Sequence, residues 1–145
     1  MEGFNFKLQK LLDIREDKEE ESKRYFKKAQ MEKDEAEARL KTLRDNYNKY
    51  RFTSSGVSLA EQKMKHIYLN ALNSSIMEAA SELQKKIKAL EARREELKQK
   101  QIERKTVEIL KDKQLQCFIK EQALVEQKSN DEFALYGFIR ANERR

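Results

Sequence analysis

The chain has 145 residues, the length of one ordinary domain, and a net charge of +6, with 40% of its residues charged and only 38% hydrophobic. So polar a composition excludes an ordinary globular core, and with no Pro or Trp and only three Gly it is typical of long helices or a coiled coil. Complete disorder is the alternative, but the five Tyr, the seven Phe and a regular apolar spacing argue against it.

The first predicted element is a helix over residues 4–51. Apolar and small residues recur three or four positions apart in a narrow stripe, of the width that a two-stranded seam needs. The stripe comprises Phe4, Leu8, Leu11, Ser22, Tyr25, Ala29, Ala36, Leu40, Leu43, Tyr47 and Tyr50. Residues 15–24, REDKEEESKR, have no apolar side chain. This segment is either a loosely packed section of the coil or a section that detaches or faces a polar partner.

A patch of small residues follows at 53–58, and it predicts a turn. Ser58-Leu59-Ala60-Glu61 fits a capping box, in which the serine accepts a hydrogen bond from a free amide of the first helical turn. Gly56 can adopt the left-handed conformation that ends a helix. Because six residues suit a connection between antiparallel helices better than an interdomain linker, we predict a helical hairpin.

The second predicted helix covers residues 59–139. Its stripe comprises Leu69, Leu72, Ile76, Ala79, Leu83, Ile87, Leu90, Arg94 and Leu97. Near 73–75 a second capping pattern, Ser75 with Glu78, leaves open a break that would make a short helix beside the turn. An unbroken second helix is roughly 120 Å long against roughly 72 Å for the first. Either its C-terminal part projects, ready to dock on another molecule, or residues before Ser75 fold back.

The positive charge is concentrated in residues 85–113, which hold eleven basic and six acidic side chains, a local charge of +5. Such a segment is either the solvated face of a coiled coil or a surface for nucleic acid, anionic lipid or an acidic protein.

No pattern in the chain predicts an enzyme, a metal site or a cofactor. There is no glycine-rich phosphate loop, and His66 and Cys117 are the single histidine and cysteine. A lone cysteine cannot form an internal disulfide, which agrees with a reducing compartment. No apolar run approaches the roughly 20 residues that span a bilayer, and the N-terminus lacks the apolar core of a secretory signal, so we expect a cytosolic protein.

Three stretches resemble one known family. FNFKLQKLLDIRE at 4–16 looks like an opening pattern of an aromatic, alternating Leu and then Leu-Asp-x-Arg-Glu, and EQKSNDEFA at 126–134 looks like a Glu-Gln-Lys-x-x-Asp-Glu-x-Ala signature. Between them, NKYR is followed by the small-residue break and then by Tyr68 and Leu72, four apart on one helical face. Together these features resemble the flagellar export protein FliJ family.

The resemblance implies an all-α, two-helix antiparallel coiled-coil hairpin, a single domain over 1–145, similar to the stalk of the rotary ATPase γ subunit. It implies a non-enzymatic part of the bacterial flagellar export apparatus that promotes assembly and activity of the export ATPase. The end facing the ATPase ring would carry Phe6, Leu8, Arg15, Glu16, Glu126, Gln127, Lys128, Asp131 and Glu132. Tyr68 and Leu72 would dock on the membrane export gate. Gly137 departs from the family pattern, so we expect helical order to end near Tyr136.

The partners implied are the export ATPase ring, the gate protein and export chaperones, with no nucleic acid and no insertion into the membrane. We expect a protein that is monomeric when free and that works in the cytoplasm beside the inner-membrane gate at the flagellar base. Two alternatives stay open at this point. One is an injectisome stalk protein of the same architecture, and the other is a basic helical nucleic-acid binder, whose affinity would fall steeply with salt.

Overall fold

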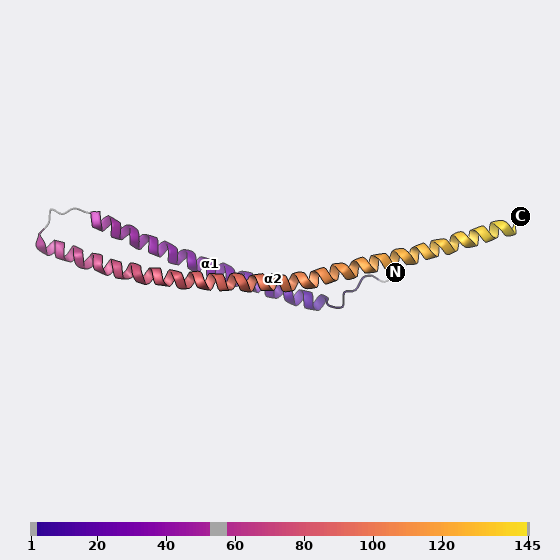
Figure 1. Ribbon diagram of the computed structural model, residues 1–145, viewed down its shortest axis with the longest axis horizontal. Helices are drawn as coiled ribbons and strands as arrows, with labels where there is room; N and C mark the ends of the chain where they lie inside the picture. Colours follow the sequence, from indigo (N-terminus) through magenta and orange to yellow (C-terminus); the bar gives the residue numbers. More distant parts are fainter. Residues whose placement is uncertain (1–2, 53–57, 145) are drawn as a thin grey trace. The chain divides into compact units, whose positions relative to one another are not determined.

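The computed structural model of the protein describes residues 3–52 and 58–144. It contains two long helices, α1 (Gln9–Phe52) and α2 (Leu59–Glu143), packed against each other as an antiparallel hairpin (Figure 1). This confirms the predicted all-α hairpin. Residues 53–57 of the predicted turn, Gly56 among them, lie outside the described residues.

The helices form two compact units that we describe separately. The first contains residues 1–17 and 102–145, and the second contains residues 18–101. In the second unit the buried seam is narrow and consists of Ala29, Leu40, Leu72, Ala79 and Leu90. In the first unit the core is a cluster of Phe6, Leu12 and Val107. The single coiled-coil domain stays a prediction.

α1 begins at Gln9, so the prediction of a helix from Phe4 is wrong by about one turn. The residues before it are irregular, and the first amide of α1, that of Gln9, donates to the Phe6 carbonyl at 3.1 Å. Phe6 is buried, and the Phe4 ring lies 5.6 Å from that of Phe118. Because residues two apart point to different sides of a helix, a non-helical entry is what lets both phenylalanines pack against α2.

At the start of α2 the predicted serine cap is present. The Ser58 hydroxyl accepts a long hydrogen bond, 3.4 Å, from the amide of Glu61, and the amide of Gln62 donates to the Ser58 carbonyl at 3.1 Å. The serine therefore satisfies one of the amides that a helix leaves free in its first turn.

α2 runs without interruption through both places where the sequence suggests an end. The break near Asn73–Ser75 is not found, because Leu72 and Ala79 on either side are buried in the seam, and packing overrides the small local preference of Asn and Ser. The expectation that order ends near Tyr136 is wrong, since α2 continues through Gly137 to Glu143. One unfavourable glycine does not stop an otherwise good helical sequence.

Arg94, predicted in the seam, lies outside it. Its side chain is 54% exposed and pairs with Glu91 at 2.6 Å. Both it and the neighbouring Arg93 lie over rings of α1: the guanidinium of Arg93 is 4.7 Å from the centre of the Tyr25 ring, and that of Arg94 is 5.9 Å from the centre of the Phe26 ring. An arginine over an aromatic face gains cation–π attraction while its charge stays in water.

The all-polar segment 15–24 is helical and packed. Glu19 and Ser22 point inward and are buried, and Glu19 lies 3.7 Å from Lys23. Arg15 donates to the Glu103 carbonyl of α2 at 2.8 Å. The structure thus matches a section of coil in which polar side chains occupy the seam. Because these polar residues make no apolar contacts across the seam, the two helices pair more weakly here.

We predict that Gly137→Ala strengthens the last turns of α2. A Cβ at Gly137 meets nothing within 4 Å, and alanine is favoured over glycine in a helix interior by up to about 1 kcal/mol. Amide hydrogen exchange over residues 133–141 should slow by up to about fivefold, the ratio that this energy corresponds to. Gly3→Ala, outside both helices, is the matched control and should leave exchange there unchanged. Equal or faster exchange in Gly137→Ala would contradict the prediction.

Candidate protein-interaction sites

Tyr68 and Leu72, the predicted docking pair, occupy different environments in the second unit. Tyr68 is 42% exposed, and its ring packs edge-on against Tyr50 with 4.6 Å between centroids. Leu72 is only 8% exposed and belongs to the seam. Of the two, Tyr68 can meet a partner, and Leu72 holds the helix that displays it.

Further exposed apolar side chains lie near Tyr68, at the end of α1 and the start of α2. We call this set the tip surface, and it comprises Tyr50, Phe52, Leu59, Met64, Ile67 and Tyr68. Sequence reasoning missed most of it because only Tyr50 and Tyr68 were singled out. The signal that could have found it was a group of large apolar residues off the seam spacing on both sides of one turn.

The N-terminal residues predicted to face a partner are largely engaged within the first unit. Phe6 is buried, Arg15 is held by the Glu103 carbonyl, and Leu8 is just exposed. Glu16 is fully on the surface. Lys111 of α2 reaches the Gln9 side chain at 2.7 Å and helps to anchor the start of α1. Phe6 and Arg15 therefore stabilise the packing of the first unit.

The C-terminal motif residues lie on α2, and all of them are exposed. They are Glu126, Gln127, Lys128, Asp131 and Glu132, and in the described part of the chain none makes a hydrogen bond or ion pair. The hollow lined by Phe4 and Asn5 reaches along α2 as far as Glu121. The structure thus places both motifs in one unit without bringing them into contact.

Beyond Gln122 every described residue of α2 is exposed, and this last part of the helix has no other element beside it (Figure 1). Large apolar side chains nevertheless continue along it, with Phe133 the most exposed at 76%. We call this set the C-terminal surface, and it comprises Leu124, Val125, Phe133, Leu135, Tyr136, Phe138 and Ile139. At about 100° per residue these side chains occupy two neighbouring faces that together cover more than half of the helix circumference.

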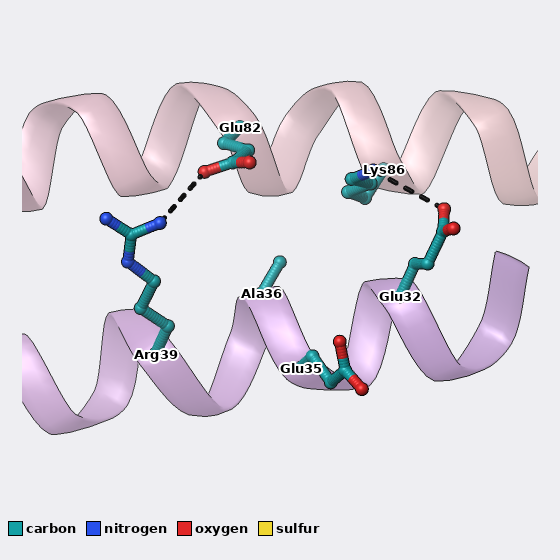
Figure 2. Close-up of a pocket in the computed structure, with 6 residues that line it drawn as sticks. All are labelled: Glu32, Glu35, Ala36, Arg39, Glu82 and Lys86. Atoms are coloured by element: carbon teal, nitrogen blue, oxygen red, sulfur yellow. Dashed lines mark hydrogen bonds and ion pairs between the residues drawn. The ribbon is translucent and has the colours of Figure 1, made fainter.

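A charged hollow of about 260 Å³ lies between α1 and α2 in the second unit, and Figure 2 shows its lining. Arg39 pairs with Glu82 at 3.4 Å, and Lys86 pairs with Glu32 at 3.4 Å, each bond joining the two helices. Ala36 lies between the two pairs. Because the opposite charges on its walls pair with each other, we assign the hollow to the alignment of the helices rather than to a ligand.

The described residues can also be compared with the requirements of a metal site and of a membrane-spanning helix. Among them, no group of His, Cys, Asp and Glu side chains could hold a metal ion. In that part of the chain no helix is both long and apolar enough to cross a bilayer. His66 and Cys117 are both exposed.

Paired helices with a charged surface, and with uncovered apolar side chains at the tip and along the end of α2, define a helical protein that works by binding other proteins. The family model described as Flagellar FliJ protein matches residues 4–143, and the chain belongs to this family. It is therefore a non-enzymatic component of the flagellar protein export apparatus. No curated protein and no solved structure matches the chain.

We predict that the two residues of the docking pair differ in their effect on stability. Leu72→Ala should lower the free energy of unfolding by about 2–5 kcal/mol, because it empties a buried seam position. Tyr68→Ala should cost about 1 kcal/mol, the value of the lost edge contact with Tyr50. Urea unfolding followed by circular dichroism measures both, with the exposed Met64→Ala as control. Equal losses at Tyr68 and Leu72 would show that the two side chains are buried alike.

Proposed function

We propose that this protein is the stalk of the flagellar export ATPase. The C-terminal part of α2 enters the centre of the ATPase ring, and the tip surface contacts the membrane export gate. By binding both, the protein promotes ring assembly, ATP hydrolysis and export. The observation that carries the proposal is the C-terminal surface, an apolar stretch of helix on which no described residue is covered.

The distribution of apolar side chains supports an enclosing partner. A helix that packs on a flat surface needs one apolar stripe, whereas a helix that is apolar over most of its circumference is normally surrounded by protein. The C-terminal surface has two such faces. Residues 123–143 extend about 30 Å at 1.5 Å per residue, the diameter of a small domain. A channel through a ring of domains is deep enough for a helix of this length, and its wall would contact both apolar faces.

The motif residues fit the same assignment. Glu126, Lys128, Asp131 and Glu132 are exposed charges in a polar segment, 126–132, that lies between Val125 and Phe133 of the C-terminal surface. Charges that the chain itself leaves unpaired are available for a partner, and at an interface they set specificity and register more than affinity. We therefore propose that these four residues and Gln127 align the helix within the ring, together with Leu8 and Glu16 at the start of the chain.

The tip surface supports a second contact, independent of the first. It holds Tyr68 and five other exposed side chains, three of the six being aromatic, and exposed aromatic groups are the usual anchors of protein interfaces. We propose that it docks on the export gate at the cytoplasmic side of the inner membrane, and that the same protein passes export chaperones to the gate. Membership of the flagellar family favours this apparatus over the injectisome alternative. We retain the prediction of a monomer before assembly.

The ring contact is tested with Phe133→Ser combined with Tyr136→Ser in the full chain. Since both side chains are exposed, we expect the variant to keep its helical content. When it is added to the purified ATPase, it should stimulate ring assembly and ATP hydrolysis at least tenfold less than the unchanged chain does. The matched control is Ile67→Ser with Tyr68→Ser, another exposed pair, in the tip surface, which should stimulate normally. Full stimulation by the C-terminal variant would sink the proposed ring insertion.

The gate contact is tested with the same two variants, but here the tip variant is the test and the C-terminal variant is the control. Ile67→Ser with Tyr68→Ser should weaken binding to the purified cytoplasmic part of the gate protein by tenfold or more, measured by calorimetry, because it removes an anchor and its neighbour. The C-terminal variant should bind the gate normally. Leaving Leu72 unchanged keeps the seam intact, so any loss reports on the surface alone. Unaltered gate affinity would remove the tip surface from the proposal.

A further inference from the structure

The outer side of α2 in the first unit carries a second, chemically distinct surface. Steps of three and four residues along α2 connect eight positions that share one face, and every one of them is exposed. We call this the outer face, and it comprises Ile102, Lys105, Ile109, Lys113, Gln116, Lys120, Leu124 and Gln127. Leu124 also belongs to the C-terminal surface. The outer face is about 38 Å long.

The outer face points away from α1. On the opposite side of the same helix Val107 is buried, Lys111 reaches Gln9, and Phe118 packs on Phe4. The contacts that hold the first unit together therefore leave the outer face uncovered. Its exposure is a consequence of which side of α2 the seam uses.

The charges of this face are of one sign and have no partner in the described part of the chain. Lys105, Lys113 and Lys120 make no hydrogen bond or ion pair there. The flanking acid Glu108 is engaged by Arg104 at 2.6 Å, and Asp112 only borders the face. In the second unit several basic side chains join the two helices: Arg39 of α1 pairs with Glu82 of α2, and Lys86 and Arg93 of α2 contact Glu32 and Tyr25 of α1. The positive charge of residues 85–113 that stays available to a partner includes Lys105 and Lys113 of the outer face, beside Lys85, Lys88 and Lys98 of the second unit.

The arrangement of lysine and apolar side chains indicates what the partner is. Isoleucines seven residues apart, flanked by lysines along one line, match the a- or d-type column and the charged flank of a helix that pairs with another helix. We infer that the outer face binds an acidic amphipathic helix of another protein. Its apolar side chains would meet Ile102 and Ile109, and its carboxylates would meet the three lysines.

Other occupants fit less well. A helix lying on a membrane separates its apolar and basic faces, whereas here both types share one narrow line. A nucleic-acid surface would offer closely spaced cations and base-reading or stacking groups, and these lysines are about 10–12 Å apart, with Ile109 and Gln116 between them. A second copy of this chain has its densest acidic stretch at residues 15–24, where no apolar side chain is present to match the isoleucines.

The test measures binding of a fluorescent synthetic helical peptide, with leucine every seven residues and glutamate on both flanks, to the full chain by anisotropy. Reversal of the three charges in Lys105→Glu, Lys113→Glu and Lys120→Glu should weaken binding about tenfold or more, as expected for the loss of three interfacial ion pairs. The matched control, Lys41→Glu with Lys63→Glu and Lys88→Glu, has the same net charge but lies in the second unit. It should bind normally, and circular dichroism should show equal helicity in all three proteins.

Several results would overturn the inference. Equal affinity in the two triple variants would mean that net charge alone attracts the peptide. Sedimentation with phosphatidylserine vesicles that is lost in the outer-face variant, with no peptide binding by the native chain, would assign the face to a membrane. A concentration-dependent dimer in analytical ultracentrifugation that only the outer-face variant loses would assign it to a second copy. None of these three measurements involves the ATPase or the gate, so failure of this inference leaves the proposed function untouched.

Discussion

Pairing of two helices along one narrow apolar seam is the constraint on which the rest of the molecule depends. A chain with 40% charged residues has too few apolar side chains for a layered core, and the buried apolar side chains of each helix lie seven or more residues apart in the described part of the chain. Most of those residues are Leu or Ala. Each contributes little, and stability comes from many small contacts in sequence. Any large apolar side chain off the seam is consequently exposed and free for another molecule.

The unequal lengths of the helices determine where such side chains collect. α1 has 44 residues and α2 has 85, so α1 cannot cover all of α2. The apolar pattern of α2 does not stop where its partner does, and this mismatch produces the C-terminal surface. In the second unit the side chains of the tip surface are likewise exposed. Both surfaces consist of apolar side chains that the helix pairing does not bury.

Charge is sorted by the same geometry. Along the second unit, residues flanking the seam pair across the helices, as Arg39 does with Glu82 and Lys86 with Glu32. Exposed pairs of this kind contribute little energy, yet they oppose a shift in helix alignment because a shift would bring like charges together. In the first unit the lysines of the outer face point the other way. The basic excess that the sequence concentrates in residues 85–113 is therefore partly paired and partly available to a partner.

The sequence alone determined the helices, the hairpin, most of the seam and the family, because helical periodicity, capping residues and terminal motifs are local patterns. It did not determine which of two adjacent positions faces the partner helix. A straight helix drifts about 20° per heptad against a regular seam, so over a long helix spacing alone cannot place Arg94 outside and Arg93 over Tyr25. Nor can it show that Leu72 is buried beside an exposed Tyr68, or that Phe6 turns inward before α1 begins. Those outcomes depend on which side chains of the other helix lie opposite each position, and only the tertiary packing decides that.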